Sequence, residues 1–176
     1  MFMKRNNVLI RVLSLAFFAR KKGLKIAVAE SCTSGLLADL LSSIAGSSAW
    51  FDFGVVCYSN ISKETLLCVN PTSIQKHGSV SKIVASEMLS GLEKITLNEK
   101  HKLFMFLSIT GVAGPTGSTK NKPRGLVWFG LQAYGKKIFK KEILVGSRTQ
   151  IRTKASLKAL ERLISESARK TKGIIE

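Results

Sequence analysis

Residues 24–44 read LKIAVAESCTSGLLADLLSSI, an apolar run followed by small polar residues and then by a second apolar pattern. Leu24–Ala29 has the length and composition of a strand. Within 33–44 the leucines and Ile44 recur every three or four residues, which predicts a helix. A strand followed closely by a helix is typical of α/β proteins, in which helices cover a sheet.

The regions on both sides continue this alternation. Upstream, residues 5–22 predict an amphipathic helix that packs on the domain and ends near Gly23. Its apolar stripe consists of Leu9, Val12, Leu13, Ala16 and Phe17. Downstream, the patterns predict strands at 51–58 and 103–109, helices at 62–69, 81–95 and 149–170, and a hairpin of 125–133 and 138–145. We therefore expect one domain over residues 1–176 with a layered α/β/α fold and a mixed sheet.

Two short-range signals locate helix starts, and one helix has a clear apolar face. Ser62 is the expected N-cap of the helix 62–69, and Pro71 suits the first position of a further helical turn. In the helix 81–95, the apolar face consists of Val84, Met88, Leu92 and Ile95.

The composition indicates a folded globular domain and excludes several classes of protein. The 176 residues are 45% hydrophobic and 22% charged with only 3 Pro, unlike a disordered chain. The uncharged run 12–19 is far too short to span a bilayer. The three Cys and two His lack the spacing of a typical structural zinc site, so no metal is expected.

The N-terminus shares only some features with a targeting signal. A basic start precedes an apolar stretch, as in a signal peptide. However, Arg11 interrupts the stretch, and 20–22 is basic where a small-residue cleavage site belongs. We therefore expect a cytoplasmic protein.

The charge is strongly positive and lies mostly toward the two ends of the chain. The formal net charge is +17, from 28 Lys+Arg and 11 Asp+Glu. Such a charge suits nucleic acid, an anionic membrane or an anionic small substrate. No aromatic platform of the kind that binds single strands accompanies it, so basic residues on solvated faces are favoured and nucleic acid is not expected.

The turn 29–35 is the first segment with possible chemistry. It joins the strand at 24–29 to the following helix, whose N-terminus favours an anion or a developing oxyanion. Cys32 in that field can act as a nucleophile if its pKa is lowered. The alternative is an ordinary turn in which Ser31 or Thr33 caps the helix and Cys32 is a small core residue.

Three further segments carry candidate groups. Ser48 lies in a Gly-Ser-Ser turn and needs a base to act as a nucleophile. Lys63 can be that base if burial lowers its pKa, and Tyr58 can assist it, provided that the three side chains converge. Otherwise Lys63 is a surface residue. The glycine-rich loop 111–117 follows a buried strand, where α/β sheets bind ligands.

Seven separated blocks occur together in this chain. They are Glu30-Ser31-Cys32-Thr33, Gly46-Ser47-Ser48, Tyr58-Ser59-Asn60 with Lys63, His77-Gly78-Ser79-Val80-Ser81, Thr110-Gly111-Val112-Ala113-Gly114-Pro115, Lys122-Pro123 with Gly125 and Trp128, and Arg148 with Ile151-Arg152. In this order they resemble the CinA C-terminal domain family, the nicotinamide-nucleotide amidases also called PncC. The resemblance covers roughly residues 8–168 and does not include the nucleotide-binding domain of longer CinA proteins.

The resemblance implies hydrolysis of the carboxamide of nicotinamide mononucleotide to nicotinate mononucleotide and ammonia, without a metal or cofactor. By position, Ser48 matches the nucleophile, Lys63 the general base and Tyr58 the residue that assists it. The substrate-binding residues implied are Ser31, Thr33, Thr110, Gly111 and either Arg148 or Arg152 for the phosphate. A homodimer is also expected.

The chain departs from the family pattern at three positions. Ser34 stands where a second glycine is usual and is expected to narrow the pocket. Arg124 and Leu126 replace small or β-branched residues around Gly125. Two other functions stay open: a cysteine hydrolase that uses Cys32, and a non-catalytic basic module on the same fold that binds nucleic acid or a ligand.

Overall fold

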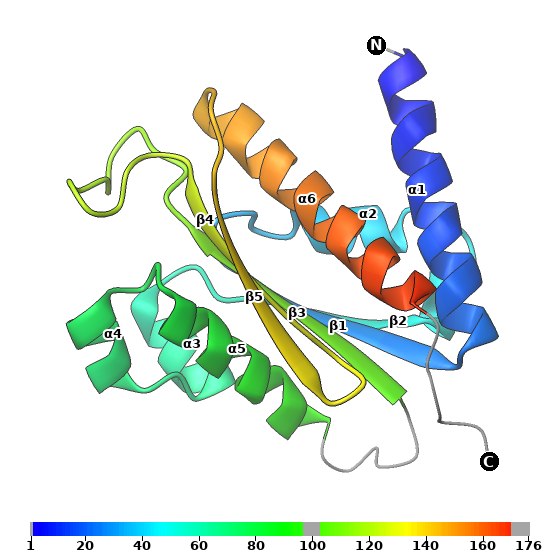
Figure 1. Ribbon diagram of the computed structural model, residues 1–176, viewed down its shortest axis with the longest axis horizontal. Helices are drawn as coiled ribbons and strands as arrows, with labels where there is room; N and C mark the ends of the chain where they lie inside the picture. Colours follow the sequence, from blue (N-terminus) through cyan, green and yellow to red (C-terminus); the bar gives the residue numbers. More distant parts are fainter. Residues whose placement is uncertain (1, 97–102, 170–176) are drawn as a thin grey trace.

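A five-stranded mixed sheet forms the centre of the protein. The computed structural model describes residues 2–96 and 103–169. The strand order is β2-β1-β3-β4-β5, in which β1, β2 and β3 are parallel to one another and β4 runs antiparallel to both of its neighbours, β3 and β5 (Figure 1). The strands are β1 (Leu24–Glu30), β2 (Phe51–Val56), β3 (Leu103–Gly111), β4 (Leu126–Ala133) and β5 (Lys136–Ile143).

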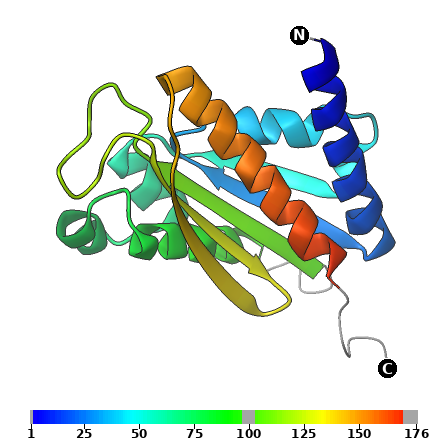
Figure 2. The same ribbon diagram turned by 45° about the horizontal axis from the view of Figure 1, so that its top comes forward.

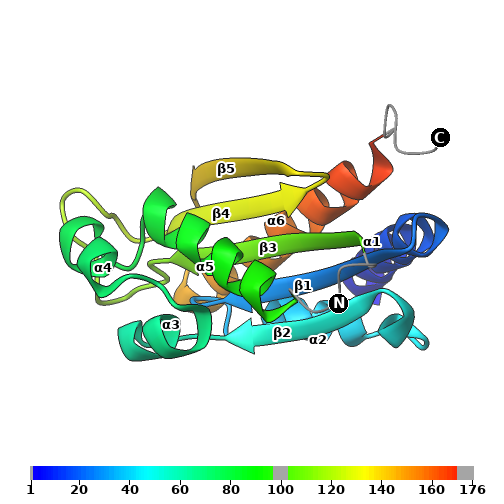
Figure 3. The same ribbon diagram turned by 90° about the horizontal axis from the view of Figure 1, so that it is seen from below.

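Helices cover both faces of this sheet. One face carries α1 (Phe2–Lys21), α2 (Leu36–Ser42) and α6 (Arg148–Ala168), and the other carries α3 (Asn60–Leu67), α4 (Pro71–His77) and α5 (Lys82–Ile95). Figures 2 and 3 show the two helical layers from different sides of the sheet. The predicted layered α/β/α fold with a mixed sheet is thus confirmed. Lys170, the last residue of the predicted helix 149–170, lies outside the described residues.

The central strands are buried on both faces because successive side chains alternate between the two layers. Ile26 and Val28 of β1 pack with the layer of α1, α2 and α6, whereas Ala27 and Ala29 pack with the layer of α3, α4 and α5. A strand with this position reads as a continuous apolar run, which is the pattern of residues 24–29.

The set of residues that α1 buries against the domain differs in part from the prediction. The buried residues are Val12, Leu15, Ala16 and Ala19, which recur at helical spacing. Leu9, Leu13 and Phe17, also assigned to the buried stripe, are 43%, 50% and 61% exposed. The helix carries apolar residues on two faces, so helical spacing alone does not determine which face packs on the sheet.

Two helix starts also differ from the prediction. The helix predicted from residue 33 begins at Leu36, because Ser34 (φ +50°) and Gly35 (φ +90°) have left-handed backbone conformations. The cap of α3 is Ser59 rather than Ser62, and its Oγ accepts the Ser62 N–H at 3.0 Å.

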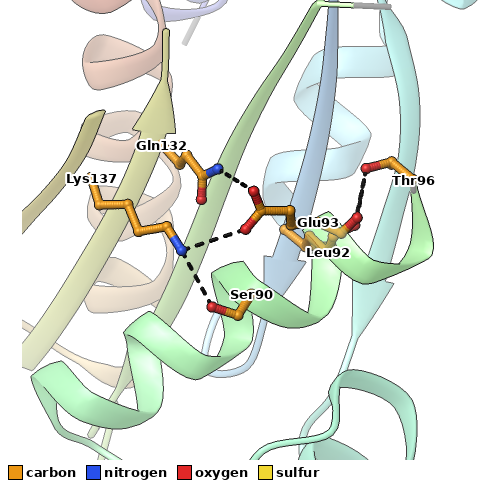
Figure 4. Close-up of polar contacts among 6 residues, drawn as sticks. All are labelled: Ser90, Leu92, Glu93, Thr96, Gln132 and Lys137. Atoms are coloured by element: carbon orange, nitrogen blue, oxygen red, sulfur yellow. Dashed lines mark hydrogen bonds and ion pairs between the residues drawn. The ribbon is translucent and has the colours of Figure 1, made fainter. Parts of the chain in front are cut away.

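The second half of α5 is bound to the β4–β5 hairpin by side chains (Figure 4). Gln132 of β4 donates to the Glu93 carboxylate at 3.0 Å. The Lys137 ammonium of β5 lies 3.5 Å from the same carboxylate and 3.3 Å from the Ser90 hydroxyl. These contacts are partly or fully exposed, so apolar packing of α5 stabilises this side of the domain more than they do. Val84, Met88 and Leu92 are buried as predicted, whereas the terminal Ile95 is half exposed.

Candidate active site

A pocket of about 300 Å³ lies at the carboxyl ends of β1 and β3, beside the residues that follow β2. This is the edge at which open α/β sheets bind ligands. The pocket is lined by Ser31, Cys32, Tyr58, Lys63, Ser79, Val80, Thr110, Gly111, Val112, Ala113, Gly114, Thr116, Gly117 and Arg148. Of the predicted site residues, the structure brings together Ser31, Tyr58, Lys63, Thr110, Gly111 and Arg148.

Lys63 is the buried cation of this pocket. Its side chain comes from α3 and is 1% exposed, which excludes the alternative of a surface lysine. The ammonium donates to the backbone carbonyls of Cys57, Tyr58 and Ser59 at 3.1, 3.2 and 3.4 Å. Removal from water lowers the pKa of Lys63 below its ordinary 10.5, and the nearby thiols of Cys57 and Cys32 oppose this shift. A lysine with a lowered pKa can accept a proton from a hydroxyl group.

Ser31 and Ser79 are the two serines that line the same pocket as Lys63, and Ser31 is the one among the predicted site residues. It directly follows β1, and its backbone N–H donates to the Ile109 carbonyl of β3 at 3.0 Å. The first N–H groups of α2 are occupied by a side chain of the protein itself. The buried carboxylate of Glu30 accepts from Gly35, Leu37 and Ala38 at 2.8 to 3.2 Å. These three N–H groups at the N-terminus of α2 therefore already have an internal acceptor and are not free to bind the anion or developing oxyanion that the turn was expected to favour.

Ser48 lies at the opposite end of the sheet. It belongs to the short turn η1 (Ser47–Ala49), which precedes β2, and its carbonyl accepts from Lys25 at the start of β1. Tyr58 and Lys63 follow the other end of β2, whose arrowhead points toward α3 in Figure 3. A strand rises about 3.3 Å per residue, so five steps along β1 separate the two ends by about 17 Å. The prediction that Ser48 converges with Tyr58 and Lys63 is therefore wrong: the three side chains of one chain do not meet.

The two arginines predicted for the phosphate have different surroundings. Arg148, at the start of α6, lines the pocket, and its guanidinium donates to the Tyr58 hydroxyl at 2.8 Å and the Gly114 carbonyl at 2.6 Å. Arg152 lies outside the pocket lining and donates to the carbonyls of Cys32 and Thr33 at 3.1 and 3.0 Å. Arg148 is thus placed to meet an anion in the pocket. The Tyr58 hydroxyl contacts Arg148, whereas the Tyr58 carbonyl contacts Lys63.

Of the remaining predicted binding residues, Thr110 and Gly111 line the pocket and Thr33 does not. Thr110 is buried and donates to the Ser79 carbonyl at 2.8 Å, which connects β3 to the segment before α5. A Cβ on Gly111 would lie 2.8 Å from the Leu126 carbonyl oxygen and 3.0 Å from the Cys32 sulfur, so only glycine fits there. Thr33 is fully buried and does not line the pocket.

Sequence reasoning missed two hydroxyl residues of the pocket, Ser79 and Thr116. Ser79 follows Gly78, whose φ is +70°, so the glycine between His77 and Ser79 was the available signal for a turn there. Thr116 lies inside the glycine-rich loop 111–117, which was predicted to bind a ligand, although Thr116 itself was not named as a site residue.

Cys32 is poorly suited to act as a nucleophile. The thiol is buried, and removal from water raises its pKa from 9.0 to about 12. The thiolate is the reactive form, so Cys32 carries almost none of it near neutral pH. This finding counts against the cysteine hydrolase.

Neither Ser34 nor Arg124, two of the departures from the family pattern, lines the pocket. The Ser34 hydroxyl donates to the Ser31 carbonyl at 3.2 Å and does not line the pocket, so it does not narrow the pocket as expected. The side chain of Arg124 lies against Gly114, at a place where a Cβ on that glycine would clash.

Within 2–96 and 103–169, no group of three His, Cys, Asp or Glu residues could hold a metal ion. None of the helices in the same ranges is long and apolar enough to cross a membrane.

The comparison with known sequences gives one family. The model of the CinA C-terminal domain matches residues 12–167. A CinA-like protein of Kosmotoga olearia is 45% identical over 142 residues, which cover 81% of this chain and 33% of that protein. The chain thus spans about a third of the length of that protein and of a putative competence-damage inducible protein of Thermoanaerobacter pseudethanolicus, which is 42% identical over 81% of this chain. A nicotinamide-nucleotide amidohydrolase PncC of Escherichia coli is 39% identical, over 82% of this chain and 85% of that protein.

Solved structures agree with this result. The competence damage-inducible protein A of Klebsiella pneumoniae superposes with a TM-score of 0.83 at 30% identity, covering 92% of this chain and 98% of that one. The competence/damage inducible protein CihA of Agrobacterium tumefaciens superposes with a TM-score of 0.79 at 34% identity, covering 90% and 94%. The family model covers most of the sequence and the solved structures share the fold, and the chain belongs to the CinA C-terminal domain family.

Proposed function

We propose that this protein hydrolyses the carboxamide of nicotinamide mononucleotide to nicotinate mononucleotide and ammonia. The observation that carries the proposal is that a serine and a buried lysine line one pocket, at the ligand-binding edge of the sheet. A Ser-Lys pair can catalyse amide hydrolysis without a third residue. Two relatives that match over most of their own length are named nicotinamide-nucleotide amidohydrolases, which supports this substrate.

The nucleophile in this proposal is Ser31. The resemblance had suggested Ser48, but that side chain is separated from Lys63 by the length of β2. Ser31 lines the same pocket as Lys63, on the turn that begins where β1 ends.

The reaction has two halves. In the first, neutral Lys63 accepts the Ser31 hydroxyl proton while Oγ bonds to the carboxamide carbon, and the tetrahedral intermediate forms. Lys63 then gives that proton to the nitrogen, the carbon–nitrogen bond breaks and ammonia leaves. In the second half, a water gives a proton to Lys63 and adds to the acyl carbon, and the proton returns to Ser31 as the acid leaves. Burial of Lys63 supports this role because it raises the neutral fraction of the amine.

The phosphate of the substrate is assigned to Arg148. Among the pocket residues that the structure describes, the side chains with ionisable cationic groups are Lys63 and Arg148, and none carries a carboxylate. Arg148 is partly held by Tyr58 and Gly114. A guanidinium binds phosphate oxygens with paired, charge-assisted hydrogen bonds.

Ammonia release tests the substrate assignment. The purified chain is incubated with nicotinamide mononucleotide or with nicotinamide riboside, which lacks the phosphate, and ammonia and the acid product are measured. We expect release from the mononucleotide and much slower release from the riboside. Equal release from both would contradict the role of Arg148. Release from neither, together with salt-dependent binding of DNA or RNA, would support the non-catalytic module instead. The homodimer and the cytoplasmic location stay predictions.

A further inference from the structure

The turn that carries Ser31 is held from two sides by charged residues that do not line the pocket. Glu30 is the last residue of β1 and directly precedes the turn. Arg152 lies in the first part of α6, 120 positions after Cys32. The sequence blocks contain both residues, but no role in the proposed reaction has so far been given to either.

Glu30 holds the end of the turn that joins α2. Its side chain is fully buried, and its two carboxylate oxygens accept three backbone N–H groups, from Gly35, Leu37 and Ala38. Its own carbonyl accepts the Cys57 N–H at 2.8 Å. A carboxylate removed from water needs such donors, and the positive end of α2 supplies them. The carboxylate therefore ties β1, the turn and α2 into one unit.

Arg152 holds the middle of the turn. Its Nε and Nη2 donate to the carbonyl oxygens of two consecutive residues, Cys32 and Thr33. The guanidinium is a rigid planar fork, so it fixes the direction of both carbonyls together. A planar trans peptide directs the next N–H opposite to each carbonyl, so those N–H groups are fixed as well.

The turn needs such support because its backbone is unfavourable. Ser34 has a φ of +50°, a left-handed conformation that residues with a side chain seldom adopt, and Gly35 follows with a φ of +90°. Without its partners this segment has more favourable conformations to adopt, and a change of the backbone directly after Ser31 is expected to shift its side chain.

We propose that Glu30 and Arg152 are positioning residues that hold the 31–35 turn, and through it the Ser31 hydroxyl, in the geometry for attack. This inference rests on the proposed function, in which Ser31 is the nucleophile. Both residues act through the turn and contact neither substrate nor reacting atoms.

The test compares Arg152→Met, Arg152→Lys and Glu30→Gln with a matched control, Arg162→Met. Arg162 also belongs to α6, but it contacts Glu142 and the ring of Phe129, outside the pocket lining. For each variant, kcat and KM for ammonia release are measured, together with hydrogen exchange of the backbone amides in 31–38. A displacement of about 1 Å at a reacting group can cost about 10²-fold in rate. We expect Arg152→Met and Glu30→Gln to lower kcat about 10²-fold, with KM changed by less than about threefold, and to speed exchange in 31–38.

The other variants separate positioning from general stability. Arg152→Lys keeps one donor group and is expected to restore part of kcat, whereas Arg162→Met is expected to keep wild-type kcat and exchange in 31–38. Wild-type kcat in folded Arg152→Met would overturn the inference, as would an equal loss in Arg162→Met or a loss without faster exchange in 31–38. If the wild type releases no ammonia, the proposed function fails separately. Unchanged exchange in folded Arg152→Met and Glu30→Gln would then overturn the positioning role too.

Discussion

Substitution of Lys63 by methionine should abolish the amidase activity while leaving the domain folded. Methionine has a similar length and no proton-accepting group, so the variant removes the base while filling much of its volume. General base catalysis contributes about 10²–10⁴-fold, and we expect kcat to fall by at least that factor. The ammonia assay measures the loss directly.

The structural cost follows from the contacts of Lys63. Three carbonyls, of Cys57, Tyr58 and Ser59, lose their donor. A buried group left without its partner costs about 1–3 kcal/mol, and water that enters the open pocket can satisfy part of this need. Loss of a buried ammonium offsets some of the rest. We therefore expect a net loss of about 1–3 kcal/mol, which lowers the melting temperature of a domain of this size by about 2–12 °C.

Lys25→Met is the matched control. Lys25 also donates to a carbonyl, that of Ser48 at 2.9 Å, but it lies at the opposite end of β1. The control should keep wild-type kcat. Wild-type kcat in Lys63→Met, or an equal fall in Lys25→Met, would refute the assignment of Lys63 as the base.

Four further results are expected. Activity should rise with pH through the pKa of Lys63, which lies below 10.5, because the neutral amine is the base; a flat pH profile of kcat/KM would contradict this. The free energy of unfolding should rise with pH between the pKa of Lys63 in the folded protein and about 10.5, because in this range Lys63 is protonated in the unfolded chain but not in the folded one. Denaturant unfolding at several pH values measures this rise, which Lys63→Met should lack. Arg148→Met should raise KM about 10–100-fold with a smaller change in kcat, since a charged hydrogen-bond donor is worth about 1.5–3 kcal/mol; an unchanged KM in steady-state kinetics would exclude the phosphate contact. A thiol reagent near pH 7 should label exposed Cys68 and leave activity intact, because Cys32 is buried with a pKa of about 12; activity loss that tracks Cys32 labelling by mass spectrometry would restore the cysteine hydrolase.

The order of strands and helices could be predicted from the sequence because each element has a simple apolar pattern. The strand 24–29 is apolar throughout since both of its faces are covered, and the helix 81–95 has one apolar face. The face of α1 could not be predicted, because Leu13 and Val12 suit burial equally well by their spacing. Caps depend on local hydrogen bonds, so Ser59 and Ser62 were difficult to distinguish.

The candidate site was predicted only in part because its residues are brought together by strand pairing. Lys63 was predicted as the base and Ser31 only as a binding residue, and their common pocket depends on β1 and β2 being parallel neighbours. The same pairing sends Ser48 to the other end of the sheet. The contacts of Arg152 with the turn, 119 and 120 positions away, leave no local signal in the sequence.

Ammonia release from nicotinamide mononucleotide by Ser31→Ala and Ser48→Ala, beside the wild type, identifies which of the two serines is the nucleophile. Loss of a serine nucleophile costs more than about 10³-fold in kcat, whereas a hydroxyl far from the pocket contributes nothing to the chemical step. We predict that Ser31→Ala is inactive and that Ser48→Ala keeps wild-type kcat. An active Ser31→Ala with an inactive, folded Ser48→Ala would contradict the account.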